Sequence, residues 1–103
     1  MIKHYDLQLN KETGRYDFSE DRAHGSCFFV WDEDLVDGHF PIPIGEIKGS
    51  FNCDYCDDLI DLTNGPTKVT RDFNVRYCKN LISLKGCAQE VGECFRCRYC
   101  PKL

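Results

Sequence analysis

The sequence contains no apolar run of the roughly 18 residues that a membrane-spanning helix needs. Its first six residues lack the basic start and apolar stretch of a secretion signal. No segment has sustained helical periodicity, low complexity or the composition of a flexible linker. We therefore expect a cytoplasmic protein with no membrane segment, in which the eight cysteines are reduced and either pack or bind metal.

Strong charge of one sign is also missing. The net charge of the 103 residues is −4, and it divides into −5 over residues 1–45 and +1 over residues 46–103. Such a distribution provides no single basic stripe, which argues against nucleic acid as the main partner.

Signatures of catalysis are absent as well. No Ser/His/Asp constellation or phosphate-cradling glycine loop is present, and the acidic groups at 32–34 and 57–58 are typical of solvated turns. His4, His24 and His39 are isolated and are interpreted as surface histidines. Neither C-x-x-C pair is expected at a helix N-terminus, where the dipole would lower a thiol pKa for redox work. We expect that the protein is not an enzyme.

What the sequence does contain is a repeat in its second half, with a period of about 22 residues. The positions in step are Ile47/Val69/Val91, Phe51/Phe73/Phe95, Cys53/Val75/Cys97, Tyr55/Tyr77/Tyr99, Cys56/Cys78/Cys100, Leu59/Leu81/Leu103 and Leu62/Leu84. A period of roughly 20–29 residues is typical of solenoids built from short parallel strands. The cysteines in step are therefore predicted to pack as rungs of a core.

The fold class predicted is mainly β: a short leucine-rich-repeat-like solenoid at 46–103, with an N-terminal β cap at 1–45 packed on it. Within a unit, the spacing of two from Phe51 to Cys53 fits a strand, and Cys56 follows on a turn. In the cap we expect strands at 2–9 and 15–18 around a turn at 10–14. The run Cys27–Trp31 reads as a buried strand, with Phe29 placed one repeat period before Phe51, and 40–45 is expected to be extended.

The segments FNCDYCDDLIDLTNGP and FNVRYCKNLISLKGC resemble leucine-rich repeats with cysteine at the inward turn position. More closely, they are similar to a repeat of phage and bacterial proteins that reads F-x-C-S-x-C-x-N-L-x-S-L-x-G-A-P, then V-G-G. The resemblance covers about 47–103, with Val75 in place of a core cysteine and Cys87-Ala88 in place of the usual ending. It implies a non-catalytic binding scaffold, encoded by a phage and acting on a host protein, for example by inhibiting a defence component.

Residues between the inward positions are expected to face solvent and to align from coil to coil. They form a polar column and a tyrosine column, and tyrosine and arginine are enriched where partners bind tightly. Stacking of the rings on one another for stability alone is the competing interpretation. The predicted partner-binding residues are Asn52, Asp54, Tyr55, Asn74, Arg76, Tyr77, Arg96, Arg98 and Tyr99.

The repeat stops at Leu103, halfway through a unit. An uncapped solenoid end presents unpaired strand groups, so the last strand, expected at 94–100, predicts self-association into a homodimer or docking of a partner. The alternative is that Pro101 and neighbouring charges protect this edge.

Zinc is the alternative reading of the cysteines. Units one and three of a solenoid lie roughly 9–10 Å apart, whereas four thiolates on one zinc lie within about 4 Å of each other, so the two C-x-x-C pairs cannot be both rungs and one site. A smaller site of Cys94, Cys97 and Cys100, with Cys87, a histidine or a second chain as fourth ligand, remains open. The alternative function is then a small zinc protein, structural or contacting nucleic acid through Arg76, Arg96 and Arg98.

We predict that the native mass spectrum of the reduced protein will contain no metal, because the thiols in step are expected to pack in the core. A metal-free dimer would indicate association through the open end. One zinc per chain would contradict the interpretation of the cysteines as rungs.

Overall fold

The computed structural model of the protein describes residues 7–18 and 27–103. These residues form a β-solenoid of roughly three turns, as the sequence predicted, with one short 3-10 turn and no α-helix in the described part. Its elements are β1 (Leu7–Asn10), β2 (Arg15–Phe18), β3 (Cys27–Phe29), η2 (Asp32–Asp34), β4 (Ile44–Ile47), β5 (Ser50–Asn52), β6 (Lys68–Val69), β7 (Phe73–Asn74), β8 (Glu90–Val91) and β9 (Phe95–Arg96).

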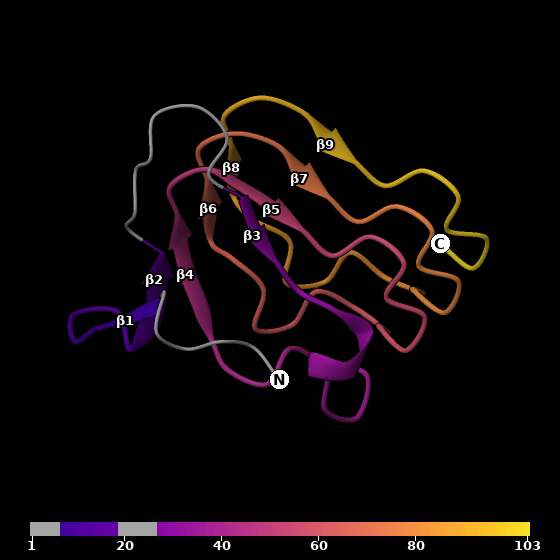
Figure 1. The fold of residues 1–103 in the computed structure, drawn as a ribbon, viewed down its shortest axis with the longest axis horizontal. Coiled ribbons are helices and arrows are strands. Elements are labelled where there is room, and N and C mark those ends of the chain that lie inside the picture. The colour runs from indigo at the N-terminus through magenta and orange to yellow at the C-terminus, as the bar shows by residue number, and fades with distance from the viewer. Residues whose placement is uncertain (1–6, 19–26) are drawn as a thin grey trace.

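Each coil contributes one strand to each of two sheets (Figure 1). One sheet has the order β3-β5-β7-β9, and the other has the order β1-β2-β4-β6-β8. All pairings between the named strands are parallel except that of the β1–β2 hairpin, which projects beside β4 at the start of the solenoid. The sequence did not predict the second sheet, because strands as short as β6 and β8 contain too few residues for an alternating pattern.

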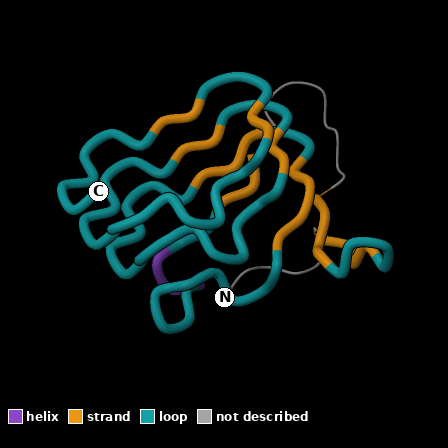
Figure 2. Tube along the Cα trace, turned by 180° about the vertical axis from the view of Figure 1, so that it is seen from behind, coloured by secondary structure: helices purple, strands orange, loops and turns teal. Residues whose placement is uncertain are grey.

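The register of the repeat is confirmed. Phe51 pairs with Phe73 and Phe73 with Phe95, each step being one repeat period. The backbone ladder continues past the strands into the turns, where the N–H of Cys53 donates to the carbonyl of Asn74 (2.9 Å) and that of Tyr55 to the carbonyl of Arg76 (2.8 Å). Figure 2 shows from behind that the loops of successive coils run alongside one another.

The interior is made of columns of identical or similar side chains. Phe51, Phe73 and three pairs of in-step residues are fully buried: Cys53 and Val75, Cys56 and Cys78, Leu59 and Leu81. Full burial of such an apolar side chain contributes about 1.5–3 kcal/mol to folding. The small thiols also bond along the axis, since Sγ of Cys78 donates to the carbonyl of Cys53 (3.3 Å) in the preceding coil.

The prediction of a continuous buried strand over Cys27–Trp31 was wrong, because only one face of the run is buried. Phe28, not Phe29, pairs with Phe51 and stacks on its ring, at 5.9 Å between centroids. Because side chains alternate along a strand, the pairing at Phe28 turns Phe29 and Trp31 outward and leaves only Phe28 and Val30 in the core. The run is therefore an alternating strand with one solvated face.

The boundary predicted at 45/46 falls inside β4, which continues from the cap segment into the first repeat. The cap itself is partly a coil of the solenoid, since β3 pairs in parallel with β5. The turn at 10–14 and the strand at 15–18 are confirmed, and the first strand is found at Leu7–Asn10. Residues 2–6 of the predicted first strand lie outside the described residues.

The last coil described is more exposed than the others. Leu103 is 47 % exposed and Leu84 37 %, whereas their counterparts one coil earlier, Leu81 and Leu62, are fully buried. The strand here, β9, is shorter than the predicted 94–100. Association through this end stays a prediction.

The buried thiol column predicts a strong contrast between two identical substitutions. Cys78→Asp should lower the free energy of unfolding by more than about 4 kcal/mol or prevent folding, because it buries a carboxylate without a partner. Cys94→Asp, at an exposed cysteine, should cost less than about 1 kcal/mol. Urea titration followed by circular dichroism measures both. Equal stability of the two variants would contradict the core assignment of Cys78.

Candidate functional site

Three tyrosines form a ladder on the surface of the solenoid. The rings of Tyr55 and Tyr77 stack at 4.6 Å with 1° between their planes, and those of Tyr77 and Tyr99 stack at 4.7 Å with 10°. The outer two side chains are 65 % and 63 % exposed, and Tyr77 between them is 38 % exposed. The predicted column is therefore formed, and its side chains remain partly exposed to solvent.

The tyrosines do not extend from the strands, as the sequence analysis expected, but from the turns that follow them. Tyr55 and Tyr77 have φ 62° and Tyr99 has φ 60°, a left-handed conformation that costs a residue with a Cβ about 1–2 kcal/mol. Stacking returns about 0.5–1.5 kcal/mol for each ring pair. Each turn thus keeps a large aromatic side chain where glycine or asparagine would fit without strain.

The polar column beside the tyrosines is held together by ion pairs between coils. Nη2 of Arg76 lies 2.9 Å from Oδ2 of Asp54, and Nη1 of Arg96 lies 2.9 Å from Oδ2 of Asp72. The hydrogen bond and charge of Asp54 raise the pKa of Arg76. Arg98 is exposed at the end of the column.

Asn74, predicted to face solvent, is instead buried at 8 % exposure, and its Oδ1 accepts a hydrogen bond from Arg96 (3.1 Å). Asn52 is half-buried and its Oδ1 caps the backbone N–H of Asp54 (3.0 Å). These two asparagines therefore shape the turn that presents the tyrosines and contribute little exposed surface.

Two aromatic residues that the sequence analysis placed in the core extend this surface. Phe29 and Trp31 stack at 5.7 Å with 12° between planes and are 50 % and 60 % exposed. Since Phe29 pairs with Asn52, Trp31 lies two residues on, in the row of Asp54 and next to the ladder. The outward position of Phe29 and Trp31 would have followed from the sequence if inward and outward side chains had been assigned alternately along the strand, starting with Phe28 inward. We name the combined surface of Phe29, Trp31, Tyr55, Tyr77 and Tyr99 the aromatic face.

An open depression of ≈ 680 Å³ lies where Trp31 meets Tyr55. The turn η2 forms its wall, held by the N–H of Trp31 donating to Oδ2 of Asp34 (2.9 Å) and by the N–H of Asp58 donating to Oδ1 of Asp32 (2.8 Å). The residues lining the depression are Trp31, Asp32, Glu33, Leu35, Asp54, Tyr55 and Asp58.

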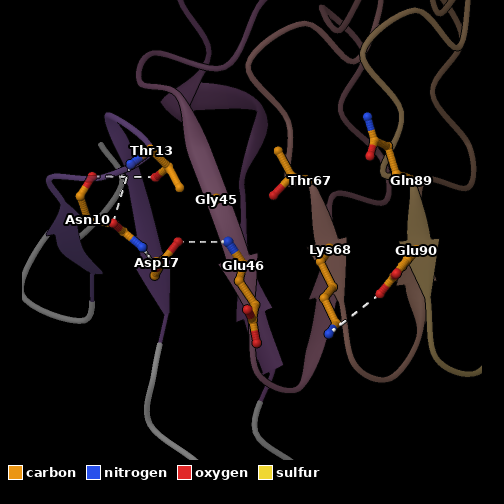
Figure 3. A pocket seen from close by; sticks show the side chains of 9 residues that line it. All are labelled: Asn10, Thr13, Asp17, Gly45, Glu46, Thr67, Lys68, Gln89 and Glu90. Atoms are coloured by element: carbon orange, nitrogen blue, oxygen red, sulfur yellow. Dashed lines mark hydrogen bonds and ion pairs between the residues drawn. The ribbon is translucent and has the colours of Figure 1, made fainter.

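A second, polar depression of ≈ 330 Å³ lies on the other sheet, over β2, β4, β6 and β8 (Figure 3). Its polar groups largely satisfy one another: Asp17 accepts from Asn10 (3.0 Å) and from the N–H of Glu46 (2.8 Å), and Lys68 pairs with Glu90 (3.5 Å). Because these groups already have partners, this depression offers less to a ligand than the first.

The cysteines of the last coil do not assemble a metal site. Within residues 7–18 and 27–103, no group of three or more His, Cys, Asp or Glu side chains could hold a metal ion, and this range includes Cys87, Cys94, Cys97 and Cys100. Sγ of Cys100 instead donates to the carbonyl of Val75 (3.2 Å). His39, predicted to be isolated, contacts Asp61 at 3.0 Å, while His4 and His24 lie outside the described residues.

Burial makes the interior thiols poor nucleophiles. Desolvation raises the pKa of Cys78 to about 12 and also raises the pKa values of Cys53 and Cys56. The thiolate is the reactive form, so these cysteines are suited to packing and not to redox chemistry. Because their folded pKa values lie above the unfolded value, their contribution to stability is complete below pH 9 and declines as the pH rises towards 12.

No protein-family model, no curated protein and no solved structure matches the chain. Among the residues that the structure describes, no helix has the length and apolar character needed to cross a membrane. The case for a function therefore depends on the geometry of the aromatic face.

Alkylation by iodoacetamide at pH 8 should distinguish the cysteines. Cys94 should react at nearly the rate of a cysteine in an unfolded peptide. The reaction of Cys53, Cys56 and Cys78 should be slower by a factor of about 100 or more, because these thiols are buried and protonated. Peptide mass spectrometry gives each rate, and the same reaction in urea supplies the unfolded control. Equal rates for Cys78 and Cys94 in the folded protein would contradict the burial of this column.

Proposed function

We propose that the protein is a non-enzymatic protein-binding module that recognises its partner through the aromatic face. The observation that carries the proposal is the concentration of exposed aromatic side chains on one surface. Four of the five rings are at least half exposed, and every ring stacks on a neighbour within the face.

Physical arguments favour a protein as the ligand of this surface. Tyrosine, tryptophan and arginine carry much of the binding energy in protein interfaces. The stacked rings of Tyr55, Tyr77 and Tyr99 are already ordered, so they lose little conformational freedom when a partner covers them. A rigid aromatic surface of this kind gives contact area at low entropic cost.

Electrostatics support a protein over nucleic acid. Arg76 and Arg96, which the alternative function assigned to phosphate contacts, each pair with a carboxylate in this structure. Phosphate binding would have to compete with these pairs, whose geometry is close and direct. The zinc protein with a nucleic-acid role is therefore the weaker proposal.

The partner proposed is a host protein. This step rests on the resemblance of the repeat to phage proteins, which favours an accessory protein that modulates or inhibits a host factor in the host cytoplasm. A protein that inhibits a host factor by covering part of its surface needs a rigid binding surface and no catalytic residues. A solenoid with an aromatic face meets this requirement.

A substitution at the centre of the ladder tests the proposal. Tyr77→Gly removes both ring stacks but relieves the left-handed strain, so the free energy of unfolding should change by no more than about 1 kcal/mol. Affinity for a partner isolated with the wild-type protein should fall by about tenfold or more, as for a central aromatic contact. Biolayer interferometry measures the affinity, and urea titration measures the stability.

Ile82→Ser provides the matched control, because Ile82 is 58 % exposed but lies outside the aromatic face. This variant should bind the partner as tightly as the wild type. Loss of binding in Ile82→Ser with full binding in Tyr77→Gly would overturn the proposal. Affinity that falls steeply with added salt in both proteins would instead support nucleic acid.

A further inference from the structure

We infer that the depression between Trp31 and Tyr55 receives an arginine side chain of the protein partner. The inference rests on the proposed function, because it assigns one anchor point within the surface that the partner covers. It begins from the walls of the depression, which are two exposed aromatic rings surrounded by carboxylates.

The aromatic walls provide faces for a cation. Trp31 is 60 % exposed, and Phe29 stacks on its ring at 5.7 Å, which fixes its orientation. Tyr55 is 65 % exposed and is fixed in the same way by Tyr77 at 4.6 Å. Cations bind over the faces of such rings, with tryptophan as the strongest acceptor.

The rim provides negative charge that the basic side chains of the described residues leave largely unneutralised. Four carboxylates line the depression, and Asp54 pairs with Arg76. Within the described part of the chain, no lysine, arginine or histidine forms an ion pair with Asp32, Glu33 or Asp58. An incoming cation therefore meets three carboxylates without having to displace any of these basic groups.

The combination favours arginine over lysine. A guanidinium ion is planar, so it stacks on a ring face while its N–H groups, which lie in its own plane, remain free to bond to carboxylates around the ring. The ammonium group of lysine is strongly hydrated and directs its bonds from a point, which uses the flat walls less well. A volume of ≈ 680 Å³ leaves ample space for the head group and its stem.

Trp31 reports on the depression directly, because it is the sole tryptophan of the chain. Acetylated, amidated tetra-arginine is titrated into the full-length protein at near-physiological salt, with tetra-lysine and tetra-glutamate as comparison peptides. Tetra-arginine should change the tryptophan fluorescence to saturation, tetra-lysine should bind at least about threefold more weakly, and tetra-glutamate should have no effect.

Charge-matched variants locate the response. Glu33→Gln with Asp58→Asn removes two charges of the rim and should weaken tetra-arginine binding by about fivefold or more. Glu12→Gln with Glu93→Gln removes the same charge from exposed positions that do not line the depression, and its affinity should equal that of the wild type. Tyr55→Asn removes one wall and keeps a residue that tolerates φ 62°, and it should weaken binding by about threefold.

Three results would overturn the inference: no saturable response to tetra-arginine, equal binding of tetra-lysine, or equal weakening by the two double variants. The last two would mean general charge attraction without a site. The proposed function is tested separately, by the effect of Tyr77→Gly on the partner. Partner binding that depends on Tyr77 with no response to tetra-arginine would remove the arginine anchor alone.

Discussion

The backbone ladder between successive coils is the interaction on which the rest of the molecule depends. The N–H of Phe51 donates to the carbonyl of Asp72 and that of Phe73 to the carbonyl of Cys94, both at 2.8 Å, and the same step recurs in strands and turns. Once this register is set, every side chain of a repeat is stacked on its counterpart in the next coil. Apolar residues that repeat then make a continuous core, and polar or aromatic residues that repeat make continuous surface columns.

The columns of side chains on the surface of the solenoid follow from this constraint. Tyrosine at the same turn position in each coil must produce a stack, and Asp54 below Arg76 must produce an ion pair. The face changes character only where the repeat does. At β3 the in-step positions are occupied by Phe29 and Trp31, and the adjoining turn η2 brings its acidic residues beside the ladder. The most distinctive chemistry therefore lies where the irregular segment meets the regular one.

The sequence was sufficient to predict which side chains are buried where it repeats, and it was misleading about burial where it does not repeat. Phe51, Cys53, Cys56 and Leu59 were assigned inward because the copies agree, and the structure buries them fully. Before β5 there was no second copy, and Phe28 lies one residue further from Phe51 than the repeat period, so the run Cys27–Trp31 was interpreted as buried on both faces. The left-handed turns at the tyrosines were hidden because tyrosine has no preference for that conformation. Consequently the 22-residue repeat did not reveal Trp31, Glu33 and Asp58, which line the depression.

The length of the tyrosine ladder is set by the number of coils in the solenoid. Insertion or deletion of one whole coil would add or remove a single ring and would move Trp31 relative to Tyr99 by one strand spacing, about 4.8 Å. The packing of a coil depends only on the coils that directly adjoin it, since each contacts only its neighbours. A surface of this kind can therefore be lengthened or shortened by whole coils to match partners of different size, while the contacts within each coil stay the same.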